Sequence, residues 1–497
     1  MAGFAHVTVV LGGPHVTHLW EPYLTARRLV VRGEGEHPML LLAQHVLEGE
    51  GSLQDIPGLA YCVGGEVRAN PISLGPFDDV DAIPFPDYSL LPSKEFYLPA
   101  IATTRGCSYG CFFCSEGHRP YRARSAENVE RELYALKEQY DGRVRYLAFN
   151  DDTFTAAPGR VNEMCDVLDR VFPDKSRFGF CCEARADVLA DHPELIVRLK
   201  EAGLVAMQIG IESGNQGLLD AMNKRVRVDQ IEAVVAHCND AEVPYIAGNF
   251  ICGLPDQTRE DVEDEIAFAK RLADLAPERI ELTMKALMPY PGTEYRRNAS
   301  KWGLSILDGD FVTGRTARAS FVETADLSKE QIEESCQRFM VEVGDYIMKQ
   351  AAPRLSPRKT KELLILAAET SQRTFVINRL CYFLHVARLL LLRRREDHRF
   401  LLEIAEHLAP KCAPVAVAEN AVAPSKEGVT VNRGSPLEFD LTMEQMTYYQ
   451  YFVGKLSFEE IARRTASEKG VAEEQTFKEC MDVYMECEDC LAAIVLI

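Results

Sequence analysis

Six short apolar segments recur through the middle of the chain, and helical patterns separate most of them. The segments are residues 100–104, 144–149, 177–182, 205–211, 245–252 and 280–287. Ser125 is placed to cap the first of the intervening helices. Strand and helix in regular alternation favour a parallel sheet. Six such units predict an α/β fold, a partial (β/α)6 barrel of the TIM type over residues 100–310.

Three cysteines follow the first predicted strand. Cys107, Cys111 and Cys114 are separated by three and then two residues, so one short loop can bring them to a single metal centre. Soft thiolates select iron–sulfur clusters, zinc or Cu(I). A [4Fe–4S] cluster normally takes four cysteines, so a loop that offers three leaves one iron open. Active sites in barrels lie at the C-terminal ends of the strands, and this loop stands at such an end.

A structural zinc site is the other interpretation of this loop. Structural zinc takes four ligands, so His118 or Cys62 would have to supply the fourth. Three unrelated core cysteines are a further alternative. These interpretations differ in outcome, because a closed zinc site only holds a fold together, whereas an open iron can bind a substrate.

The composition indicates an acidic chain without a disulfide framework. The 497 residues carry a formal net charge of −20 and a sequence pI of about 5.1. General binders of nucleic acid or anionic membranes need basic surface, so we expect neither partner. Fifteen cysteines without regular spacing favour the reducing cytoplasm. The most apolar stretch, residues 380–392, is too short to span a bilayer, and we expect no transmembrane segment and no signal peptide.

Residues 1–70 show the same alternation of strand, glycine turn and helix. An apolar strand at 6–11 ends in Gly12-Gly-Pro-His15, and a second strand at 29–32 ends in Gly33-Glu-Gly-Glu36, before a helix at 38–48. Two strands leave an unpaired edge and cannot alone form a stable doubly wound sheet. We therefore expect an incomplete, Rossmann-like half-domain, followed by a Pro- and Asp-rich connector at 71–99.

Three further parts are expected after the barrel. Residues 325–407 are helical, residues 408–436 are a linker rich in Ala, Pro and Val, and residues 437–497 form a small helical or winged-helix-like module. Three more cysteines lie in this module, at Cys480, Cys487 and Cys490. Their spacing is helical, which favours core packing over a second cluster.

The run Thr103-Thr-Arg-Gly-Cys-Ser-Tyr-Gly-Cys-Phe-Phe-Cys114 resembles the cluster loop of radical S-adenosylmethionine (SAM) enzymes. The resemblance implies that the three cysteines hold a [4Fe–4S] cluster, whose open iron binds the amino and carboxylate groups of SAM. Reductive cleavage of SAM then yields a 5′-deoxyadenosyl radical, with electrons from a donor such as flavodoxin or ferredoxin. Phe113 would pack beside the cluster and offer backbone groups to the adenine.

The later strand ends match the SAM-binding segments of this family in order. The residues that the resemblance assigns to SAM, besides Phe113, are Asp152, Glu183, Arg185, Glu212, Ser213, Gly253, Leu254 and Pro255. Asp152 would accept hydrogen bonds from the amino group. Of Glu183 and Arg185, one could hold ribose hydroxyls and the other a carboxylate. The structural alternatives are a helix-capping Asp152 and a salt bridge between Glu183 and Arg185.

The N-terminal segment resembles the second half of a cobalamin-binding domain of the kind fused to radical SAM enzymes. The two glycine turns and Ile83-Pro-Phe-Pro86 in the connector carry this resemblance. The resemblance implies that four residues contact cobalamin: Gly12, Gly13, Gly33 and Glu34. The first strands of that domain are absent here, so we expect that a misplaced start, a partner chain that completes the sheet or decay of the domain accounts for the half-domain.

Members of that subfamily are mostly methyltransferases acting on unactivated carbon or phosphorus, with some cyclases. The resemblance therefore implies a cobalamin-dependent C-methyltransferase acting on a natural product or peptide. One alternative is a cobalamin-independent radical SAM enzyme for rearrangement, cyclisation or methylthiolation. Another is a non-catalytic barrel that binds a protein or peptide. No catalytic residue beyond the cluster ligands is assigned.

Overall fold

The computed structural model describes residues 8–25, 28–73, 75–90, 99–117, 119–142, 144–307 and 320–351, together with three short strands and three single residues near the C-terminus. The chain divides into two compact units. The first unit comprises Met1–Leu90, Pro99–Gly309 and Ala317–Val343, and holds nearly all the described residues. Residues 380–392 and the sites named above at His118, Cys480, Cys487 and Cys490 lie outside the described residues.

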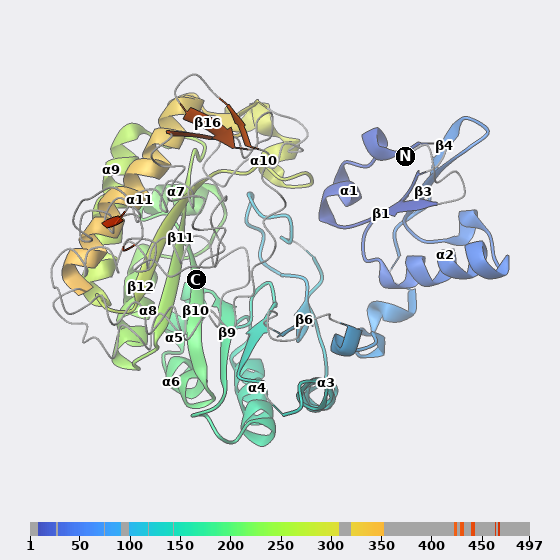
Figure 1. The fold of residues 1–497 in the computed structure, drawn as a ribbon, viewed down its shortest axis with the longest axis horizontal. Helices are drawn as coiled ribbons and strands as arrows, with labels where there is room; N and C mark the ends of the chain where they lie inside the picture. Colours follow the sequence, from blue (N-terminus) through green and yellow to red (C-terminus); the bar gives the residue numbers. More distant parts are fainter. Residues whose placement is uncertain are drawn as a thin grey trace. The chain divides into compact units, whose positions relative to one another are not determined.

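Six parallel strands form the main sheet of the first unit (Figure 1). They are β5 (Ala100–Ile101), β8 (Tyr146–Phe149), β9 (Gly179–Ala184), β10 (Leu204–Glu212), β11 (Tyr245–Cys252) and β12 (Ile280–Ala286). The order is β12-β11-β10-β9-β8-β5, so each new strand adds to the same edge. Every predicted strand segment overlaps one of these strands, and the predicted α/β architecture is confirmed.

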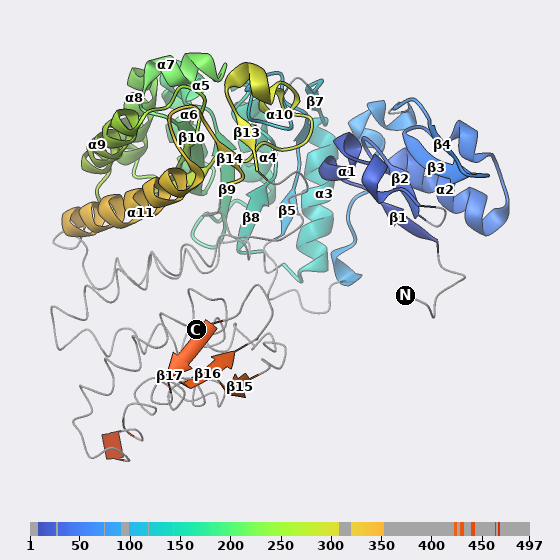
Figure 2. The ribbon, with the colours of Figure 1, turned by 90° about the horizontal axis from the view of Figure 1, so that it is seen from above.

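Helices between the strands cover one face of this sheet (Figure 1, Figure 2). They are α3 (Ala126–Gln139), α4 (Pro158–Val171), α5 (Ala186–Asp191), α6 (Glu194–Glu201), α7 (Gln216–Ala221), α8 (Val228–Asp240) and α9 (Arg259–Leu275), followed by α10 (Glu294–Arg297) and α11 (Lys329–Ala351). Ser125 caps α3 as predicted, because its hydroxyl accepts from Asn128 N at 3.1 Å. Two short strands, β13 (Ser305–Ile306) and β14 (Val322–Glu323), pair before α11.

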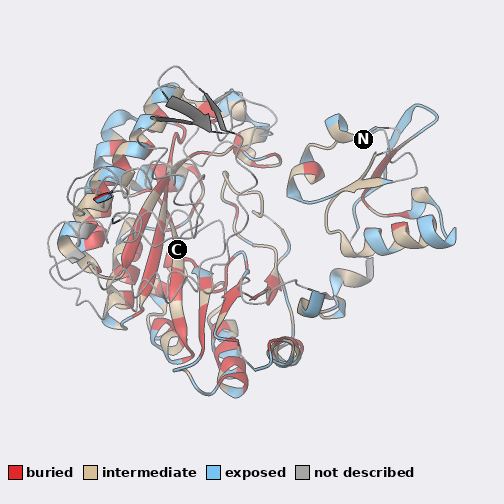
Figure 3. Ribbon diagram, viewed as in Figure 1, coloured by how far each residue is buried: buried red, intermediate tan, exposed pale blue. Residues whose placement is uncertain are grey.

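Aromatic side chains fill the layer between sheet and helices, where the buried residues concentrate (Figure 3). The Phe149 ring lies 4.5 Å from that of Phe154 and 5.4 Å from that of Phe180, measured between centroids. Further along the sheet, the ring centroid of Phe250 lies 5.0 Å from that of Phe339 on α11. Burial of such large apolar side chains is the main stabilising contribution to a layered fold.

The N-terminal segment forms its own sheet of four strands. The strands are β1 (Val9–Leu11), β2 (Arg28–Val31), β3 (Leu59–Val63) and β4 (Glu66–Ala69). β1 and β2 are parallel, whereas β3 and β4 pair antiparallel, and the helices α1 (Pro14–His18) and α2 (Glu36–Glu48) follow β1 and β2. The apolar runs and glycine turns of the sequence predict β1, β2 and α2 but not the β3–β4 hairpin. Its signal was the turn Gly64-Gly65, where both residues have positive φ as a type I′ turn requires.

Three short antiparallel strands are described near the C-terminus. They are β15 (Val422–Pro424), β16 (Gly428–Val431) and β17 (Phe439–Thr442), in that order. β15 and β16 fall within the segment expected as a linker, and β17 within the expected C-terminal module. The boundaries of these C-terminal parts stay predictions. Among the described residues, no helix is both long and apolar enough to cross a membrane.

A substitution of Gly58 tests the close contact between the residue that precedes β3 and Arg32, which follows β2. Gly49 is the matched control. Both residues have positive φ, but a Cβ at Gly58 would meet the Arg32 carbonyl oxygen at 2.3 Å, whereas one at Gly49 meets nothing within 4 Å. Both alanine variants should lose about 1 kcal/mol because alanine disfavours the left-handed region. Gly58→Ala should lose a further ~1–3 kcal/mol through the overlap.

The two tryptophans, Trp20 and Trp302, allow this loss to be measured locally. Trp20 packs on the Val16, Val30 and Ala60 core of the N-terminal segment. We would follow urea unfolding by Trp20 fluorescence in a Trp302→Phe background. Equal losses of unfolding free energy in the Gly58→Ala and Gly49→Ala variants would contradict the close contact of Gly58 with the Arg32 carbonyl.

Candidate active site

The cysteine loop connects the two strands of a short ribbon. β6 (Thr104–Arg105) pairs antiparallel with β7 (Arg122–Ala123), so the loop between them is closed at its base. Cys107 forms an isolated bridge with Gly117 just above this base. Gly106 has a φ of 79°, and a Cβ there would meet the Pro120 carbonyl oxygen at 2.3 Å. The glycine before the first cysteine is therefore required by the path of the loop.

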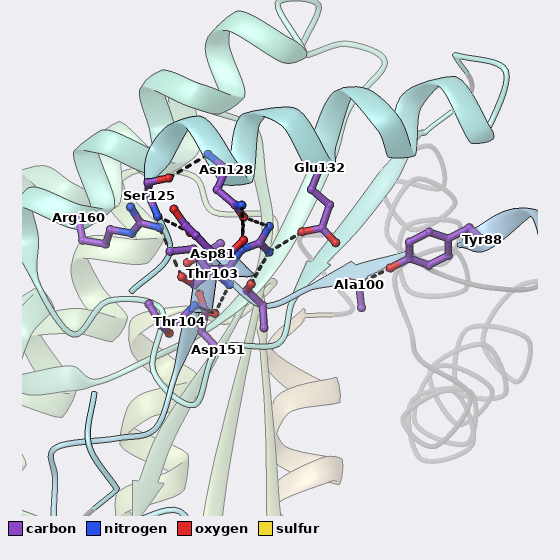
Figure 4. Close-up of polar contacts among 12 residues, drawn as sticks. Asp81, Tyr88, Ala100, Thr103, Thr104, Ser125, Asn128, Glu132, Asp151 and Arg160 are labelled. Atoms are coloured by element: carbon purple, nitrogen blue, oxygen red, sulfur yellow. Dashed lines mark hydrogen bonds and ion pairs between the residues drawn. The ribbon is translucent and has the colours of Figure 1, made fainter. Parts of the chain in front are cut away.

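A buried carboxylate fixes the chain where it leaves the sheet toward this loop. Asp151 follows β8, is 2% exposed, and accepts from Thr103 N at 2.6 Å and Thr104 N at 2.8 Å (Figure 4). The Thr103 hydroxyl donates to its other oxygen at 2.8 Å. Burial raises the pKa of Asp151, and these hydrogen bonds oppose the rise. Asp152 was predicted as a site residue and Asp151 was not, because an Asp-Asp pair in a sequence does not reveal which member turns inward.

The connector is tied to the start of α3 and to β5 (Figure 4). Asp81 accepts from Ser125 N at 2.9 Å, and its carbonyl accepts from Asn128 Nδ2 at 3.1 Å. The Tyr88 hydroxyl donates to the Ala100 carbonyl at 2.6 Å. The connector thus contacts β5, which precedes the cysteine loop, and the start of α3, which follows it.

The middle of the cysteine loop rests on two other parts of the barrel. Phe112 N donates to the Met222 carbonyl at 3.0 Å, and Asn223 Nδ2 donates to the Gly110 carbonyl at 2.7 Å. The Phe112 ring packs against Trp302, with 5.3 Å between centroids. The Phe113 ring lies near Lys224, whose Nζ is 5.9 Å from its ring centroid, and its contact with the cluster stays a prediction. Phe112 and Phe113 therefore contact different residues.

The three thiols lie half-buried in this loop and form no disulfide. Burial raises the pKa of Cys111 and raises that of Cys114 to about 11, whereas Lys224 and Arg185 lower that of Cys111. Thiols of this kind become ligands by releasing protons to a metal centre. Among the described side chains, no three His, Cys, Asp or Glu are placed to share one metal ion. A cluster does not need this, because each cysteine ligates a different iron.

Three of the predicted SAM contacts face one another at neighbouring strand ends. They are Asp152 after β8, Glu183 on β9 and Glu212 on β10. Burial raises the pKa of Glu183, and the negative charges of Asp152 and Glu212 raise it further. Desolvation also raises the pKa of Asp152, with the Glu116 carboxylate adding to the effect. Polar and cationic ligand groups would relieve this mutual repulsion.

In the described structure, the Arg185 guanidinium already binds neighbouring residues. Arg185 is 5% exposed, donates to both oxygens of Asp187 at 3.0 Å and to the Lys224 carbonyl at 2.7 Å. Its guanidinium carbon lies 3.5 Å from the centroid of the Tyr109 ring. The ion pair of Arg185 is therefore with Asp187, not with Glu183 as the structural alternative supposed. A contact of Arg185 with SAM stays a prediction.

The turn that ends β10 places Glu212 and Ser213 differently. Glu212 has a φ of 63° and pairs with the buried Lys224, Nζ to Oε1 at 2.7 Å. Ser213 donates to Glu265 of α9, and Gly214 N donates to the same carboxylate at 2.6 Å. Lys224 and Glu265 were missed by the sequence analysis. A glutamate on the apolar face of the α9 pattern was the available signal for Glu265.

The Gly253-Leu-Pro255 turn follows β11 as predicted. Gly253 has a φ of 83°, and the Gln257 side-chain oxygen accepts from Gly253 N at 2.7 Å and Leu254 N at 3.3 Å. Leu254 and Pro255 are buried. This local pairing fixes the backbone of the turn, and its contact with adenine stays a prediction.

The glycine turns of the N-terminal segment share one edge of the sheet, after the parallel strands β1 and β2. The Thr17 hydroxyl joins them, because it donates to the Gly13 carbonyl at 2.9 Å and accepts from Gly33 N at 3.0 Å. Ligands of α/β sheets bind at the carboxyl ends of such strands. Glu34 does not join this group: its carboxylate pairs with Arg105 at 3.0 Å and with Arg122.

Comparison with known proteins identifies the barrel. The model of the "Radical SAM superfamily" matches residues 101–269. Residues 101–269 of the barrel match a radical SAM domain. The cysteine loop, Asp152, Glu183 and Glu212 all lie within the matched residues, and the three half-buried thiols suit the [4Fe–4S] cluster that the family implies.

The similarity of this chain to two curated relatives extends beyond the matched domain. An uncharacterized methyltransferase of Pyrococcus horikoshii is 33% identical over 302 residues, which is 58% of this chain and 62% of the relative. The anaerobic magnesium-protoporphyrin IX monomethyl ester cyclase of Rubrivivax gelatinosus is 30% identical over 302 residues, 57% of this chain and 52% of the relative. The chain thus spans only about half to three-fifths of the length of these relatives.

Solved structures share the fold of this chain. OxsB, solved with aqua-cobalamin and SAM bound, has a TM-score of 0.57 and 17% identity, covering 98% of this chain and 71% of OxsB. TsrM of Kitasatospora setae, solved with cobalamin and a [4Fe–4S] cluster bound, has a TM-score of 0.50 and 18% identity, covering 69% and 72%. At this level of identity, the likeness concerns the fold alone.

The carboxyl group of Glu265, which binds the turn at Ser213, has a pKa near neutral pH. Its side chain is 1% exposed, and burial raises its pKa from 4.5 to about 7, with hydrogen bonds from Ser213 and Gly214 opposing the rise. Asp261 and Asp264 on the same helix raise it further. A carboxyl group with a raised folded-state pKa stabilises the fold most as the neutral acid. That contribution is complete below about pH 4.5 and is lost as the pH rises through about 7.

We predict that the free energy of unfolding of the wild type falls between about pH 5 and about pH 8 relative to Glu265→Gln. The difference should be on the order of 2–3 kcal/mol, at about 1.4 kcal/mol per pKa unit. Glutamine preserves the shape and the hydrogen bonding of the neutral acid. Urea unfolding, followed by Trp302 fluorescence in a Trp20→Phe background, measures this. The same pH dependence in both proteins would contradict the burial of an ionisable Glu265.

Proposed function

We propose that this protein cleaves SAM reductively at a [4Fe–4S] cluster held by Cys107, Cys111 and Cys114. The observation that carries the proposal is the position of the cysteine loop, at the strand ends of a radical SAM domain and beside the facing carboxylates of Asp152 and Glu183. When bound, the cluster supplies the electron that breaks a C–S bond of SAM. The protein supplies the ligands, the orientation and the exclusion of water.

The side chains around the loop divide this work. Asp152 is exposed and can accept charge-assisted hydrogen bonds from the SAM amino group. Glu183 lies on the next strand and can accept from ribose hydroxyls. Lys224 and Arg185 place positive charge beside Cys111, which favours the thiolate that a cluster needs. The Glu212–Lys224 pair joins the β10 turn to this charge.

We propose further that the reaction is a cobalamin-dependent C-methylation of a small molecule or peptide. Two relatives support this: the methyltransferase of Pyrococcus horikoshii and a hopanoid C-2 methylase of Rhodopseudomonas palustris, 30% identical over 203 residues. The shared edge of Gly12, Gly13 and Gly33 would hold cobalamin. A radical cyclisation is the second candidate, because the cyclase of Rubrivivax gelatinosus matches an equally long stretch of the chain.

The cysteine ligands are tested by Cys111→Ala, with Cys62→Ala as control. Cys62 lies on β3 of the N-terminal segment and would serve only in the zinc interpretation. After anaerobic reconstitution with iron and sulfide and reduction with dithionite, the wild type and Cys62→Ala should produce 5′-deoxyadenosine from SAM. Cys111→Ala should retain little iron and produce none. Formation of 5′-deoxyadenosine by Cys111→Ala, or its absence from a wild type with a full cluster, would refute the proposal.

The cobalamin proposal predicts that purified protein incubated with hydroxocobalamin keeps a corrinoid absorption band through gel filtration. Cys111→Ala should keep the same band, because the two cofactor sites lie on different elements. After reduction of the bound corrinoid to cob(I)alamin with titanium(III) citrate, SAM labelled with deuterium in its methyl group should transfer that methyl to the cobalt and leave S-adenosylhomocysteine. Protein that reaches full cluster content but retains no corrinoid would favour the cobalamin-independent cyclisation.

A further inference from the structure

Two arginines of like charge stand opposite each other at the base of the cysteine loop. The β6–β7 ribbon has only two residue pairs, Thr104 with Ala123 and Arg105 with Arg122. Like charges directly opposite on neighbouring strands destabilise the pairing. The two sides of the loop are also joined by the Cys107–Gly117 bridge and by a hydrogen bond from Arg124 N to the Thr103 carbonyl at 3.0 Å. A ribbon this short has few such contacts to offset the repulsion, so the closure of the loop is sensitive to what neutralises these two side chains.

Glu34 of the N-terminal segment supplies that neutralisation. Its Oε2 lies 3.0 Å from Arg105 Nη1, and its Oε1 pairs with Arg122 Nη2. Each carboxylate oxygen thus pairs with one guanidinium, and Glu34 bridges the two strands. The Arg122 side chain is 13% exposed and the Glu34 side chain 21%, so water screens this bridge less than it screens a surface pair.

The neighbours of the bridge do not replace it. Glu36 pairs with Arg105 alone, at 2.5 Å. Arg122 Nη1 donates to the Phe77 carbonyl at 3.0 Å, and its other carboxylate neighbour, Asp78, is 4.0 Å away and largely exposed. Without Glu34, the half-buried guanidinium of Arg122 would face Arg105 with no close carboxylate between them. An unpaired buried charge is costly.

We propose that Glu34 is a positioning residue for the cluster, which clamps the two strands that carry the cysteine loop. The N-terminal segment is then a structural part of the cluster site and not only a second binding domain. The predicted contact of Glu34 with cobalamin is a separate role and stays a prediction. The inference rests on the proposed function only in that a cluster occupies the loop.

The first test measures the loop without any cluster. In the iron-free protein, the alkylation rates of Cys107, Cys111 and Cys114 by iodoacetamide would be followed by peptide mass spectrometry. Glu34→Gln should raise these rates roughly tenfold, the ratio expected when one charge-assisted contact is lost. Glu66→Gln is the control, because Glu66 pairs at 3.4 Å with Arg68 on the surface of the same segment. It should leave the rates unchanged.

A double variant separates the repulsion from a simple loss of contact. In Glu34→Gln/Arg122→Gln, no like charges oppose each other, so the cysteines should react more slowly than in Glu34→Gln alone. Trp20 fluorescence and circular dichroism check that each variant is folded. Wild-type alkylation rates in Glu34→Gln, or no rescue in the double variant, would overturn the proposed clamp.

The second test concerns the cluster itself. After reconstitution, Glu34→Gln should hold less than about half of the wild-type iron, and the double variant should hold more than Glu34→Gln, in the order that the alkylation rates predict. Equal iron in Glu34→Gln and wild type would overturn a role in positioning the cluster. If even the wild type assembles no cluster, the proposed function fails, while the alkylation rates still decide whether the clamp exists.

Discussion

The buried carboxylate of Asp151 determines where the cysteine loop begins. It binds two successive backbone amides, those of Thr103 and Thr104, at the point where β5 ends and the chain turns toward the cysteines. A buried carboxylate with three hydrogen bonds can be neither removed nor moved without leaving polar groups unpaired. The loop therefore starts from a fixed point, and its other contacts only need to close it.

Those other contacts are electrostatic and come from distant parts of the sequence. Lys224 and Arg185 lie beside Cys111, and Glu34 lies between Arg105 and Arg122. Positive charge near the thiolates and paired charge at the base of the loop have different effects. The first favours metal binding, and the second keeps the loop closed before any metal arrives. An acidic chain can build such a basic environment locally, because the net charge does not describe one site.

The sequence predicted the parts of the fold that follow from periodicity. The six strands, the order of the motifs and the glycine turns of β1 and β2 all came from apolar runs and turn residues, since local sequence dictates these features. The hairpin of β3 and β4 was missed, because β4 has only four residues and all are exposed, so its short polar–apolar alternation is a weak signal. Asp151, Lys224 and Glu265 were missed because their roles depend on burial by residues far away in the chain. Arg185 and Glu34 were found as site residues, but their partners, Asp187 and the loop arginines, are set by tertiary packing.

The central claim is that three cysteines hold a cluster with one iron left open for SAM. Electron paramagnetic resonance of the reconstituted, dithionite-reduced protein, recorded with and without SAM, tests this most directly. The account predicts the signal of a reduced [4Fe–4S] cluster whose g values change when SAM is added, because SAM binds the open iron. A signal that SAM leaves unchanged would contradict it, since all four irons would then be closed to the substrate.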